Sequence, residues 1–301
     1  LLSIFLITNI LTEQLYYGRI LGGSSVIILT GIFFLIHLLC KGKVFINKEY
    51  WKYALAISVP LISHELSLIV NNQFDRIIIQ RYVGDGEAGI YSFAYNVSMI
   101  VDVVRISFAQ AVAPWIYEKM KAGEYENIRD KSNHYRNMFT LIYTVVLFIS
   151  PEIVKLIADP RYWEGLYLMP WIFMAYYFQF MYVEEIRVEI FYKKTGLVSL
   201  GTILSAAINV ILNLIFIPKY GYPAAAITTA VSFFALFIFH YILTSRVIKH
   251  KLYGLKFHLK SLAYVLGTTL MFVLFQETLW IRALFIIAAI GLFVKSLMIK
   301  K

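Results

Sequence analysis

The clearest indication of the fold is the stretch from Trp51 to Ala113, WKYALAISVPLISHELSLIVNNQFDRIIIQRYVGDGEAGIYSFAYNVSMIVDVVRISFAQAVA. It consists of two long apolar runs joined by a short polar turn at Val83–Glu87. An α-helix crosses the hydrocarbon core of a bilayer, which is about 30 Å thick, with about 20 apolar residues. Both runs satisfy that requirement, so the stretch predicts a transmembrane helical hairpin.

Both runs carry ionisable side chains far from their ends: His64 and Glu65 in the first, and Asp102 and Arg105 in the second. Charges at such depth in a membrane are costly, so they normally face a cavity or one another. Pro60 precedes the first pair, and because it lacks an N–H group we expect it to loosen the helix there. The four residues predict a polar interior, with the remaining helices as its scaffold.

The composition is that of an integral membrane protein, because 60% of the residues are hydrophobic, only 15% are charged, and the mean hydropathy is +0.70. The apolar runs are continuous, which favours helices over barrel strands, whose apolar residues alternate. We therefore predict an all-α polytopic membrane protein with about nine complete transmembrane helices and a partial one at Leu1–Leu11. The complete spans are Gly22–Cys40, Trp51–Asn71, Gly89–Ala113, Met138–Val154, Leu166–Tyr182, Leu197–Ile217, Ala224–Leu243, Leu259–Phe275 and Ile281–Leu297.

The net charge of +10 would suggest a nucleic-acid partner in a soluble protein. Here most of the basic residues gather at every second connection between the spans, which is the positive-inside pattern of a multi-pass protein of the inner membrane. The pattern predicts a cytoplasmic carboxyl terminus and no nucleic-acid partner. The clusters are Lys41–Lys52, Lys119–Arg136, Arg187–Lys194, Arg246–Lys260 and Lys295–Lys301.

Signals of catalysis are missing from the sequence. It contains no nucleophile motif, phosphate loop, zinc spacing or nucleotide fingerprint, so we expect no catalytic residues, no metal site and no cofactor. The connections between spans are too short for an extramembrane catalytic domain. Cys40 is the single cysteine, so no internal disulfide can form.

Three segments resemble the Wzx-type polysaccharide or oligosaccharide flippases of the multidrug/oligosaccharidyl-lipid/polysaccharide (MOP) exporter superfamily. Asn71–Val97, NNQFDRIIIQRYVGDGEAGIYSFAYNV, is similar to the family's span end with Asp-Arg, glycine-containing turn and following helix. Asn209–Phe234, NVILNLIFIPKYGYPAAAITTAVSFF, is similar to its Asn-rich helix, Pro-x-Tyr-Gly turn and small-residue helix start. A weaker similarity is FYKKTG at Phe191–Gly196.

The resemblance implies two lobes of six helices followed by two additional helices, with both termini in the cytoplasm. Aligned in this way, the chain looks like an amino-terminally truncated fragment that lacks most of the first lobe. Residues 1–42 would be the tail of the amino-terminal lobe, residues 43–250 the carboxyl-terminal lobe, and residues 251–301 the two additional helices.

The implied function is the export of an undecaprenyl-pyrophosphate-linked oligosaccharide across the bacterial inner membrane, by alternating access, for O-antigen, capsule or exopolysaccharide assembly. The implied partners are that lipid-linked oligosaccharide, membrane lipids, and the polysaccharide polymerase and chain-length machinery; coupling to a proton or sodium gradient is left open. One alternative is a drug or cation antiporter of the same superfamily. A membrane polysaccharide polymerase or ligase is less favoured, because such enzymes commonly have a long periplasmic loop.

The interior charges supply the first candidates for substrate binding. Arg105 is the only basic residue deep in a span, and a guanidinium group binds phosphate oxygens in a bidentate fork. An intrahelical pair with Asp102, three residues earlier, is an equally good interpretation. Glu65 is either a proton carrier or a buried partner of Arg105, while His64 is more simply explained as a hydrogen-bonded interior histidine.

Three amides in the later spans, Gln179, Asn209 and Asn213, are further cavity candidates. Asn209 and Asn213 lie one turn apart, a spacing that also suits interhelical hydrogen bonds. Charged residues nearer the span ends are expected to form gates or structural ion pairs. Asp75 and Arg76 would fix the hairpin, and either a solvated gate or a rim of ion pairs near the inner surface would contain Glu184, Glu185, Arg187 and Glu189.

Overall fold

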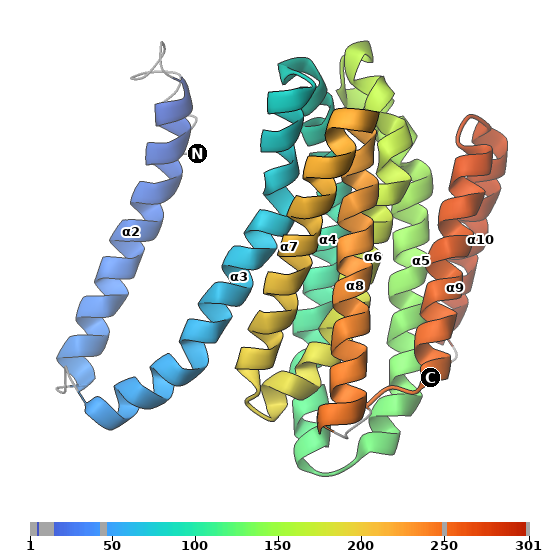
Figure 1. Ribbon diagram of the computed structural model, residues 1–301. Helices are drawn as coiled ribbons and strands as arrows, with labels where there is room; N and C mark the ends of the chain where they lie inside the picture. Colours follow the sequence, from blue (N-terminus) through green and yellow to red (C-terminus); the bar gives the residue numbers. More distant parts are fainter. Residues whose placement is uncertain (1–4, 6–14, 43–46, 249–251, 299–301) are drawn as a thin grey trace. The chain divides into compact units, whose positions relative to one another are not determined.

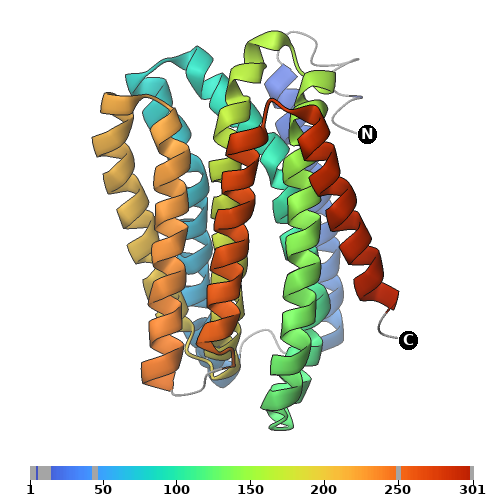
Figure 2. The same ribbon diagram turned by 90° about the vertical axis from the view of Figure 1, so that its right-hand side faces the viewer.

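The computed structural model describes residues 5, 15–42, 47–248 and 252–298 (Figures 1 and 2). Within these ranges every regular element is a helix and no strand occurs, so the predicted all-α class is confirmed. The helices are α2 (Leu15–Gly42), α3 (Lys48–Tyr82), α4 (Asp85–Lys121), α5 (Tyr125–Ile157), η1 (Pro160–Leu168), α6 (Met169–Phe191), α7 (Thr195–Tyr220), α8 (Pro223–Leu243), η2 (Thr244–Ile248), α9 (Leu255–Phe275) and α10 (Leu279–Met298).

Each complete span predicted from the sequence coincides with one long helix; only the start of the fifth, Leu166–Leu168, falls in η1. The partial span predicted at Leu1–Leu11 lies outside the described residues except for Phe5. Seven of the described helices, α2 to α5 and α7 to α9, are long and apolar enough to cross a membrane. The chain is an all-α polytopic membrane protein.

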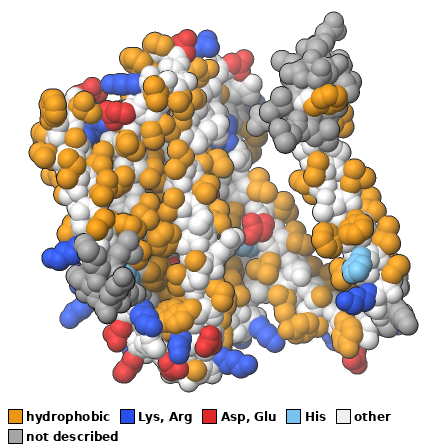
Figure 3. Space-filling model, turned by 180° about the vertical axis from the view of Figure 1, so that it is seen from behind, with side chains coloured by type: hydrophobic (Ala, Val, Ile, Leu, Met, Phe, Trp, Pro, Cys, Tyr) orange, Lys and Arg blue, Asp and Glu red, His pale blue; other side chains and the backbone are white. Residues whose placement is uncertain are grey.

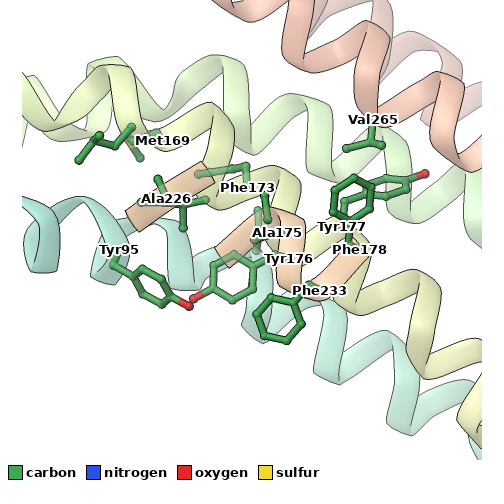
Figure 4. Close-up of a cluster of buried hydrophobic side chains, with 14 of the residues drawn as sticks. Tyr95, Met169, Phe173, Ala175, Tyr176, Tyr177, Phe178, Ala226, Phe233 and Val265 are labelled. Atoms are coloured by element: carbon green, nitrogen blue, oxygen red, sulfur yellow. The ribbon is translucent and has the colours of Figure 1, made fainter. Parts of the chain in front are cut away.

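Helix α6 is the centre of the bundle, because most of its residues are buried and it contacts α4, α5, α7, α8 and α9. Its aromatic rings interlock with those of its neighbours: the rings of Phe180 and Phe139 stack with centroids 4.3 Å apart. The ring centroids of Tyr176 and of Tyr95 on α4 lie 5.7 Å apart, and the two hydroxyl groups point toward one another (Figure 4). Offset and edge-on ring contacts of this kind stabilise a packed core beyond the area that they bury.

The outer helix faces are apolar, while charged side chains gather toward the ends of the larger unit (Figure 3). A wide band of exposed large apolar side chains is unfavourable in water and suits contact with lipid tails. The band therefore supports a membrane environment for the bundle. Representative members are Leu204, Ile211 and Leu214 on α7, Leu259, Leu266 and Leu270 on α9, and Leu284, Ile287 and Ile290 on α10.

The connections of α3 to α10 alternate between two ends of the bundle. We call the end with the α4–α5 turn, the α6–α7 turn and the start of α9 the basic end, after its many lysines. There Lys119 donates to both oxygens of Glu124 at 3.0 Å, and these bonds lower the pKa of that carboxyl. At the opposite end Gly221 takes a φ of 72°, a conformation that suits glycine, in the predicted Tyr-Gly turn.

The chain divides into two compact units, Leu1–Ala56 and Ile57–Lys301. The smaller unit holds α2, whose apolar side chains are largely exposed, and the first turns of α3. The larger unit holds the rest of α3 and all later helices, including α9 and α10, which pack on α5. The boundaries predicted after residues 42 and 250 remain predictions.

Gly201 on α7 provides a test of the packing. A Cβ atom there would lie 2.5 Å from Nε2 of His240 and 2.8 Å from the ring of Phe239. Alanine normally stabilises a helix relative to glycine by about 1 kcal/mol, but overpacking costs about 1–3 kcal/mol. We therefore expect Gly201→Ala to lower the thermal unfolding midpoint of the purified protein.

Gly267→Ala on α9 is the matched control, since nothing lies within 4 Å of a Cβ atom at that position. The control should unfold at the wild-type temperature or above it. Equal midpoints for the two variants would contradict the close packing of α7 against α8.

Candidate functional site

Polar contacts join α3 to α4 near the turn between them, at the end of the bundle opposite the basic end. Asp75 is fully buried, accepts a hydrogen bond from the hydroxyl of Tyr91, and accepts another from the backbone N–H of Arg76 at 2.8 Å. The guanidinium of Arg76 lies 4.8 Å from the ring centroid of Tyr95. Asp75 and Arg76 thus join the two helices of the hairpin, in agreement with the structural role expected for them.

Arg105 and Asp102 form an ion pair on α4. Nε and Nη2 of Arg105 each lie 2.7 Å from Oδ1 of Asp102. The side chains are 11% and 20% exposed, respectively, so the pair is neither closed into the core nor fully solvated. The spacing of three residues brings the two groups together on one face of α4, and both side chains stay partly exposed.

Glu65 is exposed on α3, where it lines a shallow pocket with Ser58, Leu61, Ile62 and Leu66. The hydroxyl of Tyr182 on α6 lies within electrostatic range of Glu65, Asp102 and Arg105. Three of the predicted cavity candidates therefore interact electrostatically with one buried tyrosine. Among the described contacts, however, Arg105 pairs with Asp102 and not with Glu65.

His64 is buried next to α7, unlike its neighbour Glu65. Its Nδ1 lies 3.2 Å from the hydroxyl of Thr202, and Asn71 further along α3 donates to Ser205 at 2.8 Å. The helix runs unbroken through Pro60. His64 therefore joins α3 to α7 by a hydrogen bond, while Glu65 is exposed on another face of α3.

The three amide candidates are buried and hydrogen-bonded between helices. Gln179 on α6 donates to Oδ1 of Asn72 at 3.5 Å. Asn213 donates to Asn209 at 2.9 Å, and Asn209 donates to Thr229 of α8 at 3.2 Å. These contacts agree with the interhelical packing role; sugar contact for the amides stays a prediction.

The charged residues of α6 near the basic end are buried, unlike the solvated gate that the sequence suggested, and they include an ion pair, which was the alternative. Glu184, Glu185, Arg187 and Glu189 are each at most 4% exposed. Nη1 of Arg187 lies 2.5 Å from Oε2 of Glu184, which also accepts from the hydroxyl of Tyr253 at 2.6 Å. The segment that leads into α9 covers this pair, which explains its burial.

Two histidines that sequence reasoning missed pair with the other two carboxylates. Nδ1 of His240 on α8 lies 2.7 Å from Oε1 of Glu189, and Nε2 of His258 on α9 lies 2.7 Å from Oε1 of Glu185. With neutral imidazoles, the three carboxylates of this cluster outnumber its one guanidinium by two. Buried net charge is costly, and each histidine supplies one of these carboxylates with a partner from another helix.

Two buried arginines were also given no role in the predictions from the sequence. Arg282 of α10 pairs with both oxygens of Glu152 on α5, at 2.5 and 2.6 Å. Arg136 of α5 is 1% exposed and donates to the backbone oxygen of Phe257 at 3.3 Å. The sequence signal was the presence of cations inside or beside apolar runs, which normally have partners. No group of three metal-ligating side chains occurs in the described ranges.

Comparisons with known proteins bear on the part of the chain that holds the α3–α4 charges. Residues 1–120 match the family described as "Polysaccharide biosynthesis protein". A protein of the Lsg locus of Haemophilus influenzae is 24% identical over 204 residues, 65% of this chain and 49% of that protein. The chain is thus similar to polysaccharide biosynthesis proteins over its first 120 residues. The predicted resemblance to polysaccharide flippases is confirmed.

A second relative carries the flippase name itself. The "Probable low-salt glycan biosynthesis flippase Agl15" of Haloferax volcanii is 25% identical over 174 residues, 55% of this chain and 36% of that protein. The chain thus spans about half or less of the length of these curated relatives. Glu65, Asp102 and Arg105 lie within the segment that matches the family, whereas the α6 cluster lies beyond it.

Arg187→Met tests the buried pair on α6. It leaves the carboxylate of Glu184 without its counter-charge in a dry site, and breaking such a pair costs about 3–5 kcal/mol. Adding Glu184→Gln removes the orphaned charge and should restore much of the lost free energy of unfolding. Chemical denaturation in micelles measures both variants.

The control is Arg161→Met, because Arg161 and Asp159 form an exposed pair with 73% and 59% of their side chains accessible. An exposed pair contributes at most about 1 kcal/mol. If Arg187→Met were as mild as this control, the α6 pair would not be buried as described.

Proposed function

We propose that the chain is part of a transporter, not an enzyme, that flips an undecaprenyl-pyrophosphate-linked oligosaccharide across the bacterial inner membrane for surface polysaccharide assembly. The observation that carries the proposal is the partly exposed Arg105–Asp102 pair within one long apolar helix, with Glu65 exposed on the preceding one. The match of the α3–α4 hairpin to a polysaccharide biosynthesis family adds support.

The substrate carries a pyrophosphate, two sugars or more, and a long lipid tail, and each part needs a different environment. A guanidinium group can bind two phosphate oxygens at once, and Arg105 has one such group at the open side of α4. Asp102 holds that group in place when no anion is present. On arrival of a pyrophosphate, Arg105 would exchange one anionic partner for another, and water would have to solvate the carboxylate of Asp102, which is 20% exposed.

Glu65 gives the site a titratable group that faces the same region. A carboxylate close to an incoming pyrophosphate repels it, and protonation of the carboxylate removes that repulsion. Glu65 is therefore our candidate for coupling transport to a proton gradient. The lipid tail would stay in the bilayer beside the apolar outer faces of the helices.

The mechanism we propose is alternating access, in which the polar region opens to one side of the membrane and then to the other. The basic end would face the cytoplasm, because lysine and arginine are retained on that side. This orientation also puts the carboxyl terminus in the cytoplasm. The polysaccharide polymerase and the chain-length machinery would act on the product at the opposite end.

The exposure of Glu65 also keeps a second function in view, the export of organic cations. A carboxylate in an apolar groove binds a cation, whereas the anionic substrate needs Arg105. The two functions therefore depend on different residues of the same hairpin.

Arg105→Ala is the deciding variant, tested in the protein as encoded in full. Charge-assisted hydrogen bonds contribute about 1.5–3 kcal/mol each, so we expect flipping of a fluorescent lipid-linked oligosaccharide in vesicles to slow by about tenfold or more. Arg105→Lys should recover part of the rate, since it keeps the charge and loses the fork.

Arg81→Ala is the control, because Arg81 is exposed at the end of α3 and should not affect flipping. An unchanged rate in Arg105→Ala would remove Arg105 from the mechanism. Loss of cation export in Glu65→Gln, with Arg105→Ala still active, would favour the antiporter.

A further inference from the structure

A separate cavity of about 250 Å³ lies at the basic end, where α5 and α9 begin. Its cationic lining residues are Arg129 of α5 and Lys256 and Lys260 of α9. Asn133, Tyr253 and Phe257 complete its walls. We call it the α5–α9 pocket; it lies apart from the α3–α4 charges discussed above.

The pocket collects positive charge without a carboxylate among its lining residues. Lys256 and Lys260 stand four residues apart on α9, and like charges at that spacing destabilise a helix. Arg129 is held beside them, because its Nε donates to the backbone oxygen of Leu252 at 3.3 Å. An anion in the pocket would relieve the repulsion among the three cations.

The surrounding structure increases the positive potential. Helix α9 starts after Gly254, which supplies no side-chain cap, so the positive end of the helix dipole lies at the pocket. Beneath the pocket, Arg136 donates to the backbone oxygen of Phe257 and lies 4.9 Å from its ring centroid. Fixed cations and backbone donors of this kind bind phosphate groups.

The pocket is also amphipathic. Its floor contains the stacked rings of Tyr253 and Phe257, with centroids 4.7 Å apart. Next to its lysines, the exposed side chains of Leu255 and Leu259 begin the apolar outer face of α9. A ligand with a phosphate at one end and hydrocarbon chains at the other would fit both parts.

We propose that the α5–α9 pocket binds the phosphate of an anionic phospholipid head group, such as that of phosphatidylglycerol, at the membrane surface. The bound lipid joins the starts of α5 and α9 by neutralising cations from both helices. It is a structural ligand and not the transported cargo. The inference does not depend on the proposed flipping activity.

The test counts the phosphatidylglycerol molecules that stay with the purified protein. The protein in phosphatidylcholine nanodiscs is titrated with phosphatidylglycerol and examined by native mass spectrometry. A lysine near an anionic membrane surface contributes about 1 kcal/mol, so Lys256→Gln with Lys260→Gln should weaken retention by about 30-fold. Arg129→Gln, on the other helix, should weaken it independently.

The matched control is Lys193→Gln with Lys194→Gln, which removes the same charge from the α6–α7 turn at the same end of the bundle. This control should retain phosphatidylglycerol as the wild type does. Equal retention in the pocket variant and the control would overturn the proposal.

Competition separates the sources of the phosphate. Excess inorganic phosphate should leave the bound phosphatidylglycerol in place, since it lacks hydrocarbon chains; displacement would mean a site for free phosphate. Displacement by undecaprenyl pyrophosphate at equal concentration would mean that the pocket belongs to the transported lipid. Either displacement would overturn the assignment to a structural phospholipid.

Discussion

A charge inside a membrane protein must find its partner within the protein, and the Arg187–Glu184 pair on α6 shows how much of the bundle that constraint organises. Arg187 reaches the hydroxyl of Tyr135 on α5 and the backbone oxygen of Ala109 on α4, each at 3.4 Å. Tyr253, just before α9, donates to Glu184 at 2.6 Å. Three neighbouring elements must therefore be in place before this pair is satisfied. Partnering of this kind is what makes a buried pair costly to break.

The α3–α4 hairpin treats its charges differently. Arg105 and Asp102 have one another but stay partly exposed, and Glu65 is exposed on α3. Exposed apolar side chains such as Ile62 and Val103 lie on the same helices. Lipid tails would suit the apolar groups but not the ionised ones. We therefore propose that water or a polar substrate meets this part of the hairpin, in contrast to the buried charges of α6.

The sequence predicted the helices well, because a run of about 20 apolar residues in a membrane protein has few alternatives to a helix. The predicted span Trp51–Asn71 is shorter than α3, because hydropathy does not mark helix ends. The helix continues to Tyr82, next to the predicted turn at Val83–Glu87. The Arg105–Asp102 pair followed from local spacing. The partners of Glu189 and Arg282 did not, because His240 and Glu152 are distant in the chain and meet them only through helix packing.

Thiol labelling at position 65 is the most direct measure of whether water reaches the middle of the α3–α4 hairpin. In a Cys40→Ser background, Glu65→Cys is compared with Ile211→Cys, which is 55% exposed on the apolar face of α7. Vesicles containing either variant are treated with a charged, membrane-impermeant thiol reagent. If water reaches the hairpin, labelling will be rapid at position 65 and almost absent at position 211. Equal resistance at both positions would contradict water access, because both side chains would then face lipid.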